Sequence, residues 1–412
     1  MADVEGGKAD LIVRNGRILD PAAGLDFIGD VAVRGSRVVQ TGQKLDLSAK
    51  TEFDATGCLV TAGLIDCHIH GYQYSTPLGI NIDEACLSRG VTTVVDAGSS
   101  GASTFLGLKK FIADRSHTRL LAFLHIASHG LAAAGCSGGA SGGESESLHV
   151  VDIDDCVRCI EENRDVLVGV KVRLSKEVTN KGQHEAEVFR RALEASSRAQ
   201  VPLMTHHSSS SIPVQRSNSE DLGCPGSLRP GDIYTHTYHG FPSSIIDPSS
   251  QAVWSDVWEA RRRGVLFDVG HGQGSFSWPV AELAAKEGFW PDIISTDLHT
   301  GNFKGPAYDL PTVMTKFLAI GMPLEDVVRA TTCTPAKAIG RAHDIGSLAI
   351  GHVADITALK LEDCDVALED CHGQQRRVKR NLYPVSVWRA GKQFHTIKSF
   401  PWHSALKETP NQ

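Results

Sequence analysis

The chain has 412 residues, of which 41% are hydrophobic and 22% are charged, and its formal net charge is −7. This length suits a large barrel with an accessory domain, and the composition is that of an ordinary globular protein. The negative balance argues against a nucleic-acid groove and an anionic membrane surface. The sequence has no run of roughly 18 apolar residues, so no membrane span is expected.

The chain ends and the cysteines favour a cytoplasmic protein. Residues 1–10 are acidic and polar, without the apolar segment of a secretory signal, and the last residues are not a peroxisomal address. The ten cysteines are scattered, mostly inside apolar segments, as in a reducing compartment. Cys156 and Cys159 form a lone C-x-x-C pair in a helical pattern, where ordinary helix cysteines are preferred over a redox or zinc pair.

Both ends of the chain show short strand patterns. Residues 10–60 and 345–398 contain apolar runs separated by Gly, Asp and Asn turns. We expect residues 1–60 and 345–412 to pair into one small β-sandwich domain. A basic run, QQRRVKR at 374–380, alternates with polar residues and is interpreted as a solvated strand or loop rather than a binding patch.

The middle of the chain, residues 61–344, alternates strand and helix patterns eight times. The strand patterns lie at 59–70, 91–98, 120–127, 166–174, 201–207, 232–238, 264–272 and 292–297. The helical patterns include 184–200, 250–264 and 279–288. Continuous apolar strands that alternate with amphipathic helices indicate a buried parallel sheet. Eight such units predict an α/β fold with a (β/α)8 TIM barrel.

The first of these strands ends in an Asp-x-His-x-His run. Side chains alternate along a strand, so Asp66, His68 and His70 share one face. Two imidazoles on a strand end can bind one metal ion. Asp66 can then hold a ligand histidine in the required tautomer. The alternative is a pair of solvated histidines at a strand end.

Polar residues recur where the later strands end. In barrels of this kind the chemistry lies at the C-terminal strand ends. The residues that fall there are His70, Lys171, His206, His236, His271 and Asp297. A random scatter of polar residues would not follow this rule.

One segment has low complexity. Residues 132–147, AAAGCSGGASGGESES, follow the third strand pattern and cannot bury much apolar surface. We interpret the segment as a mobile loop on the rim of the site, with a disordered insertion as an equal alternative.

The motifs together resemble a known family. TAGLIDCHIH, GVTTVVDAGSSG, GVKVRLS, MTHHS, YTHTYHG, FDVGHG and ISTDLHTGN follow in order, between LIVRNGRILDP near the start and TPAKAIG and GSLAIGHVADI near the end. In order and strand placement they resemble the amidohydrolase superfamily of metal-dependent hydrolases. Within it they are most similar to the dihydroorotase-like amidohydrolase/deacetylase group, over nearly the whole chain.

The resemblance implies a site for two divalent metal ions, usually zinc. The residues that match the ligands of the family are His68, His70, Lys171, His206, His236 and Asp297. Lys171 corresponds to a bridging lysine that is carboxylated on its amine. A bare ammonium would be repelled by two dications, whereas a carbamate supplies two anionic oxygens. Judged from the residues alone, a salt-bridged barrel lysine is an equal alternative, and His206 is preferred to its neighbour His207 by motif position.

The resemblance also implies a mechanism. Two metal ions roughly 3.5–4 Å apart lower the pKa of a bridging water and give a hydroxide near neutral pH. The hydroxide attacks the substrate carbonyl, and Asp297 accepts its proton and donates it to the leaving group. Such a mechanism needs no serine or cysteine nucleophile.

The substrate class follows from smaller features. After the last strand the chain reads STDLHTGN rather than the Asp-His-Ala-Pro-His expected of a dihydroorotase. The motifs look more like deacetylases that act on N-acetyl-D-amino acids or acetylated 2-hydroxy acids. Arg173 shares a strand face with Lys171 and can grip a substrate carboxylate bidentately, with an ordinary rim ion pair as the alternative.

Two further positions near the strand ends have weaker interpretations. His271 can hydrogen-bond the substrate or a tetrahedral oxyanion, or it can be a structural histidine. Ser99 and Ser100 can shape the acyl pocket, although ordinary loop serines are preferred.

Three functions therefore compete. The first is a metal-dependent deacetylase that cleaves an N-acetyl amide or acetyl ester next to a carboxylate. The second is a cyclic amidase of the dihydroorotase or hydantoinase type, and the third is a non-enzymatic scaffold, which the full ligand set argues against. The expected partner is a small carboxylate-bearing molecule, with no nucleic acid and no membrane. Relatives are often homo-oligomers, but no interface can be identified from the sequence.

Overall fold

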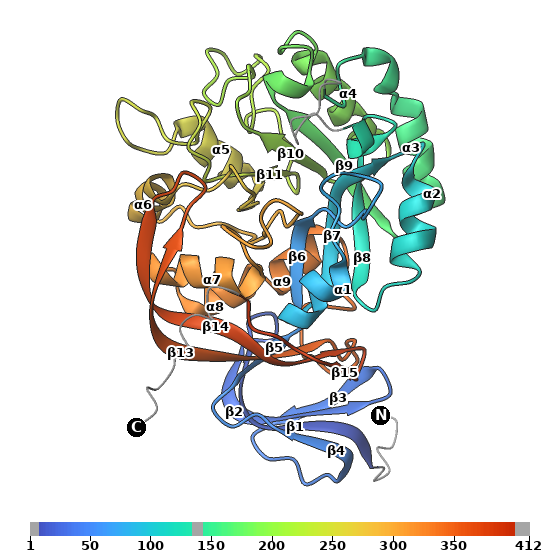
Figure 1. Ribbon diagram of the computed structural model, residues 1–412, viewed down its shortest axis with the longest axis vertical. Coiled ribbons are helices and arrows are strands. Elements are labelled where there is room, and N and C mark those ends of the chain that lie inside the picture. The colour runs from blue at the N-terminus through green and yellow to red at the C-terminus, as the bar shows by residue number, and fades with distance from the viewer. Residues whose placement is uncertain (1–7, 134–142, 400–412) are drawn as a thin grey trace, which may run out of the picture.

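The computed structural model describes residues 8–133 and 143–399, which form a barrel above a separate sheet (Figure 1). The predicted α/β fold with a TIM barrel is confirmed. Helices surround the parallel strands, and the two chain ends meet in the other sheet. In this described part of the chain, no helix has the length and apolar character needed to cross a bilayer.

The barrel wall is a curled parallel sheet. Within residues 8–133 and 143–399 its seven strands are β6 (Leu64–Ile69), β7 (Val91–Gly101), β8 (Arg119–His125), β9 (Leu167–Leu174), β10 (Leu203–His207), β11 (Ile233–Thr235) and β12 (Leu266–Phe267). Every residue of β6, β7 and β9 is buried. Burial on both faces explains why these strands are continuously apolar rather than alternating.

The eighth predicted strand, 292–297, is not a regular strand. Single parallel bridges join Asp268 to Ile293 and Ile69 to Leu298, and these bridges close the barrel. Asp297, between them, has φ +47°, in the left-handed region that interrupts a strand ladder. The interruption comes at the residue that the sequence predicts to be catalytic.

The helices follow the predicted alternation. They are α1 (Ile82–Ala85), α2 (Phe105–Gly107), α3 (Ile153–Glu162), α4 (Glu185–Arg198), α5 (Ser255–Arg263), α6 (Trp278–Lys286), α7 (Leu310–Ala319), α8 (Leu324–Arg329) and α9 (Cys333–Ala338). Short 3-10 and π segments lie at Leu87–Arg89, Leu108–Ala113, Gly130–Ala133, Leu148–Val150 and Lys176–Val178. Asp152 caps α3 by accepting a hydrogen bond from the Asp155 amide at 2.9 Å. Cys156 and Cys159 in this helix are free thiols, buried and half-buried.

The second sheet joins the two ends of the chain. Among the described residues its strands, in sheet order, are β15 (Lys392–Phe394), β14 (Gln375–Arg389), β13 (Ile356–Glu369), β5 (Leu59–Ala62), β1 (Ala9–Asp20), β2 (Leu25–Arg34) and β3 (Arg37–Gly42), and β4 (Ala49–Asp54) pairs with β1. Val31, Ile356 and Trp388 belong to one buried cluster, so both ends share a core. The domain division at residues 60 and 345 stays a prediction.

The hairpin of β13 and β14 extends beyond this sheet. Figure 1 shows it rising beside α7 toward α6. Leu368 and Val378 near its tip are part of the buried core of the barrel. The basic run at 374–380 lies in β14, where Arg376 pairs with Glu282 of α6 at 2.6 Å. The small sheet therefore reaches the mouth of the barrel.

Candidate metal centre and active site

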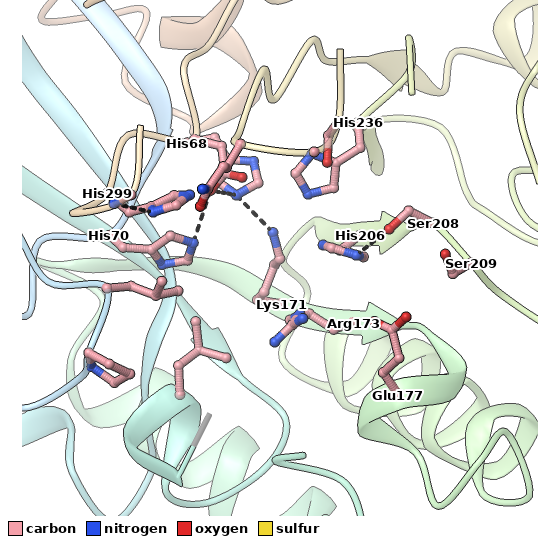
Figure 2. Close-up of a pocket in the computed structure, with 18 of the residues that line it drawn as sticks. His68, His70, Lys171, Arg173, Glu177, His206, Ser208, Ser209, His236 and His299 are labelled. Atoms are coloured by element: carbon pink, nitrogen blue, oxygen red, sulfur yellow. Dashed lines mark hydrogen bonds and ion pairs between the residues drawn. The ribbon is translucent and has the colours of Figure 1, made fainter. Parts of the chain in front are cut away.

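A cavity of about 500 Å³ lies at the C-terminal ends of the barrel strands. Figure 2 shows the labelled side chains converging on it from both sides. The predicted site residues that line it are His68, His70, Lys171, Arg173, His206, His236 and Asp297. The fold thus brings together residues up to 229 positions apart in the chain, from His68 to Asp297.

Three of these side chains converge on one point. The Nε2 atoms of His68 and His70 lie 3.3 Å and 3.1 Å from Oδ1 of Asp297. All three ligand atoms lie within 4.8 Å of one another. Two imidazole nitrogens and one carboxylate oxygen in this arrangement fit a divalent metal ion such as zinc.

Side chains of two other barrel strands, β11 and β7, contact the histidine rings. His68 Nδ1 lies 2.9 Å from Thr235 Oγ1, which donates to Asp268 Oδ2 at 2.6 Å. The threonine hydrogen is therefore committed to Asp268, so His68 Nδ1 donates and its Nε2 carries the lone pair that faces the cavity. His70 Nδ1 lies 3.0 Å from Ser99 Oγ. Such outer contacts orient metal-binding histidines.

Asp66 has a different role from the one predicted. Its oxygens accept hydrogen bonds from the backbone N–H of Thr296 at 3.0 Å and from the Thr296 hydroxyl at 2.6 Å. It also accepts from the backbone N–H of His68 at 3.4 Å, and among the residues that the structure describes it contacts no imidazole. Asp66 therefore joins the first strand to the segment before Asp297, and the ring-holding role belongs to Thr235 and Asp268. Period-two spacing places Asp66 on the correct face but does not reveal its partner.

Lys171 lies at the centre of the cavity floor. Its Nζ is 3.2 Å from His68 Nε2 and the side chain is buried (Figure 2). Burial lowers the pKa of Lys171 to about 8, although Asp297 opposes the shift. A lowered pKa increases the fraction of neutral amine, which is the form that reacts with carbon dioxide. The environment is thus suited to carboxylation of this lysine.

Two further histidines face the opposite side of the cavity. The rings of His206 and His236 are 4.3 Å apart between centroids. His236 Nδ1 donates to the Gly270 carbonyl at 2.6 Å, which leaves Nε2 available, and Ser208 Oγ is 2.7 Å from His206 Nε2, which leaves Nδ1. His207 instead contacts Tyr234 and the Ile212 carbonyl through its two nitrogens. The predicted preference for His206 over His207 fits this geometry.

Arg173, the predicted substrate-binding residue, forms an ion pair with a buried glutamate of the protein. Arg173 lines the cavity with 9% of its surface exposed, and its Nη1 lies 3.3 Å from Glu144 Oε2. Burial by itself would raise the pKa of Glu144, but Arg173 and His125 lower it to about 2. Arg173 therefore faces a fixed internal carboxylate on one side and the cavity on the other.

This pairing corrects the mobile-loop prediction for the described end of the low-complexity segment, residues 143–147. Residues 134–142 of that segment lie outside the described residues. Glu144 and Ser145 just after them are buried, and the Ser145 amide donates to the Val178 carbonyl at 3.0 Å. The end of the segment is therefore packed into the site and not a mobile rim. Composition averages over a segment and does not show that one glutamate has a buried partner.

His271 does not belong to the cavity lining. Its Nε2 accepts from Lys316 Nζ at 2.7 Å, and its Nδ1 donates to the Gly272 carbonyl at 3.0 Å. Both ring nitrogens of His271 therefore bond to residues behind the cavity wall. The structural alternative describes this histidine better than contact with the substrate, and strand-end position alone does not decide which way a ring turns.

The structure also adds cavity residues that were not singled out from the sequence. His299 lines the cavity with its ring 6.4 Å from that of His70 (Figure 2). Its signal was its place two residues after Asp297 in the STDLHTGN motif. Ser208, Ser209 and Gln273 come from loops without a periodic pattern, so sequence reasoning had no signal for them.

The chain is similar to known proteins along most of its length. The model of the amidohydrolase family matches residues 278–393. A deacetylase of Agrobacterium fabrum is 33% identical over 357 residues, which are 86% of this chain and 84% of the relative. A crystal structure of a dihydroorotase has a TM-score of 0.84 at 30% identity and covers 96% of this chain and 100% of that chain. A crystal structure of an adenine deaminase has the same TM-score of 0.84 at 28% identity, with coverage of 94% and 100%.

Proposed function

Because this chain belongs to the amidohydrolase superfamily and is a deacetylase-type hydrolase that acts on carbon–nitrogen bonds, we propose that it removes an acetyl group next to a carboxylate. The substrates that we propose are N-acetyl-D-amino acids or acetylated 2-hydroxy acids. The observation that carries the proposal is one cavity that contains both the His68–His70–Asp297 group and Arg173. The first can hold a metal ion, and the second can bind a carboxylate.

The proposed site holds two divalent ions, for which zinc suits the histidine and carboxylate donors. His68, His70 and Asp297 would hold one ion, and His206 with His236 the other. A carboxylated Lys171 would bridge the two sets. Two such ions, when bound, lower the pKa of water and polarise a carbonyl group.

Asp297 is the proposed proton carrier. Burial favours its neutral form, but His68 and His70 hold the pKa of Asp297 well below its ordinary value. The carboxylate is therefore charged at neutral pH and can accept a proton from the attacking water. It can then donate this proton to the leaving nitrogen or oxygen, which completes general acid–base catalysis by one group.

Arg173 is the proposed carboxylate anchor. A planar guanidinium can offer two parallel N–H donors to a carboxylate, and it keeps its charge at all relevant pH values. Leu78, Leu131 and Phe241 supply apolar lining to the same cavity. A substrate with a carboxylate and an apolar side chain would match both kinds of surface.

A substrate panel tests the proposal. N-acetyl-D- and N-acetyl-L-amino acids and acetylated 2-hydroxy acids are assayed with metal-loaded protein beside hydantoins and dihydroorotate. We expect acetate release from the acetylated carboxylates. The similarity to a dihydroorotase structure at 30% identity supports a cyclic amidase as the second candidate. Ring opening of dihydroorotate or a hydantoin, without acetate release from any acetylated compound, would establish that candidate instead.

A further inference from the structure

A second polar cluster lies buried behind the cavity wall, between α7, the loop after β12 and the tip of the β13–β14 hairpin. Lys316 of α7 is fully buried. Its Nζ donates to His271 Nε2 at 2.7 Å, to the Pro306 carbonyl at 3.0 Å and to the Glu369 carbonyl at 2.6 Å. Burial lowers the pKa of Lys316 only to about 8, so the amine is an ammonium at neutral pH and has an N–H group for each of the three contacts. Burying a charge is costly unless it is fully hydrogen-bonded, and here it is.

The ammonium fixes the state of His271. Because Lys316 can only donate, Nε2 of His271 must accept, and the ring hydrogen must lie on Nδ1. That hydrogen is donated to the Gly272 carbonyl at 3.0 Å. The ring also stacks on Phe276, with centroids 4.6 Å apart and planes at 17°. Lys316 thus holds His271 in one tautomer and one orientation.

Gly272 links this cluster to Asp297. Its φ is +60°, and a Cβ at this position would lie 2.7 Å from Asp297 Oδ2. Its amide donates to the Thr296 carbonyl at 2.9 Å. The glycine backbone is therefore packed directly against the proposed proton carrier. The residues that follow it, 273–275, line the cavity.

The hairpin tip holds the far side of the same loop. The Cys371 amide donates to the Phe276 carbonyl at 3.0 Å, and Asp370 Oδ2 accepts from the Trp278 amide at 3.0 Å. The Glu369 carbonyl is itself a Lys316 acceptor. The second sheet therefore braces the loop that carries Gly272, through the bonds of Cys371 and Asp370 and through the buried Lys316.

We propose that Lys316 is a positioning residue for the hydrolytic reaction, which acts through His271 to hold the Gly272 backbone against Asp297. The inference rests on the proposed role of Asp297 as proton carrier. A catalytic group displaced by about 1 Å can lose roughly 10²-fold in rate. A purely structural lysine would affect the stability of the fold and leave turnover by the folded enzyme unchanged.

Kinetics of matched variants test the inference. Lys316→Met keeps the apolar stem and removes all three donors. We expect its kcat per metal-loaded molecule to fall roughly 10- to 100-fold, with KM within about twofold of wild type. His271→Gln retains an acceptor toward Lys316 and should keep most of the turnover, whereas His271→Leu should match Lys316→Met. Arg376→Gln breaks another ion pair between the hairpin and the barrel and serves as the control with wild-type kcat.

Amide hydrogen exchange supplies a readout that needs no substrate. In metal-loaded protein, residues 272–275 should exchange faster in Lys316→Met and His271→Leu than in wild type or Arg376→Gln. Wild-type kcat or wild-type exchange in folded Lys316→Met would overturn the inference. If Lys316→Met does not fold, kcat and amide exchange are compared between His271→Gln and His271→Leu instead. The inference then requires a lower kcat and faster exchange in His271→Leu than in His271→Gln. A wild type that hydrolyses nothing in the panel would refute the proposed function, and the exchange data would still decide whether Lys316 positions this loop.

Discussion

The two sides of the cavity are built differently. On the inner side, the ligand atoms of His68, His70 and Asp297 lie within 4.8 Å of one another, and side chains of other barrel strands contact the two rings. On the outer side, Arg173 is held by Glu144 at 3.3 Å, and Glu144 comes from a connecting loop. The proposed chemistry therefore rests on residues at the ends of barrel strands, whereas the proposed carboxylate anchor, Arg173, also depends on a partner from a loop.

This difference predicts that inner-side variants affect every substrate, whereas outer-side variants separate one substrate from another. Inner-side changes should also alter metal binding. Outer-side changes should leave the metal in place.

The largest effect is expected at Lys171. Lys171→Ala removes the group that would carry the bridging carboxylate, so we expect loss of bound metal and of activity to the level of a protein-free control. Elemental analysis should find about two metal ions in wild type and fewer in the variant. Added short-chain carboxylic acids should restore part of the bound metal and part of the activity, because their carboxylate can replace the missing bridge. Full metal content with an unmodified lysine amine would contradict carboxylation.

Asp297→Asn should have the next largest effect. The amide can still bind weakly through oxygen but cannot carry a proton, so kcat should fall roughly 10²- to 10⁴-fold while KM changes little. Metal content, measured in the same preparation, separates this loss from loss of the ion. A fall below about tenfold would assign proton transfer to another group.

Thr235→Val tests the support of the inner side. The change keeps the shape of the side chain and removes the acceptor for His68 Nδ1, so we expect metal affinity to fall roughly 10- to 100-fold. Competition with a chelator measures that affinity. Thr237→Val is the matched control, because Thr237 is equally buried but bonds only to backbone carbonyls. Equal losses in both variants would indicate damage to the strand rather than loss of ring orientation.

Arg173→Met tests the outer side. A charge-assisted contact is worth about 1.5–3 kcal/mol, so kcat/KM for N-acetyl amino acids should fall roughly 10- to 100-fold. The variant should cleave an uncharged acetyl ester or amide nearly as fast as wild type does. Arg173→Lys should recover only part of the loss, since a point charge cannot reproduce the planar fork. Equal losses on charged and neutral substrates would remove Arg173 from the substrate site.

Glu144→Gln should have the smallest effect, and the effect should depend on pH. The pKa of Glu144 is lowered from 4.5 to about 2, so its ionised form stabilises the fold above pH 4.5 and that stabilisation is lost as pH falls toward 2. The variant should be less stable than wild type by about 1 kcal/mol at neutral pH, and the difference should shrink on acidification. Denaturant unfolding of both proteins in the presence of a chelator measures this difference in stability, because neither protein then carries metal. A difference that does not change with pH would contradict the ion pair.

Much of the fold was predictable because its signals are local. Continuous apolar strands between amphipathic helices predicted the barrel, and period-two spacing placed His68 and His70 on one face. The strand-end rule and the family resemblance then placed Lys171, His206, His236 and Asp297 around one site, where the structure finds them. Lys171 and His206 lie on regular strands, whose geometry fixes the direction of each side chain, whereas His236 and Asp297 lie just outside regular strands with left-handed backbone.

The remaining features depend on contacts between distant segments, which no local pattern encodes. The structure decided that Asp66 binds Thr296, that Glu144 enters the site and that His271 turns toward Lys316. Each of these contacts forms between segments that are brought together only when the barrel closes. Sequence periodicity determines which face a residue occupies, but its partner is determined by tertiary packing, because buried polar groups must bond to whichever donor or acceptor the fold places beside them.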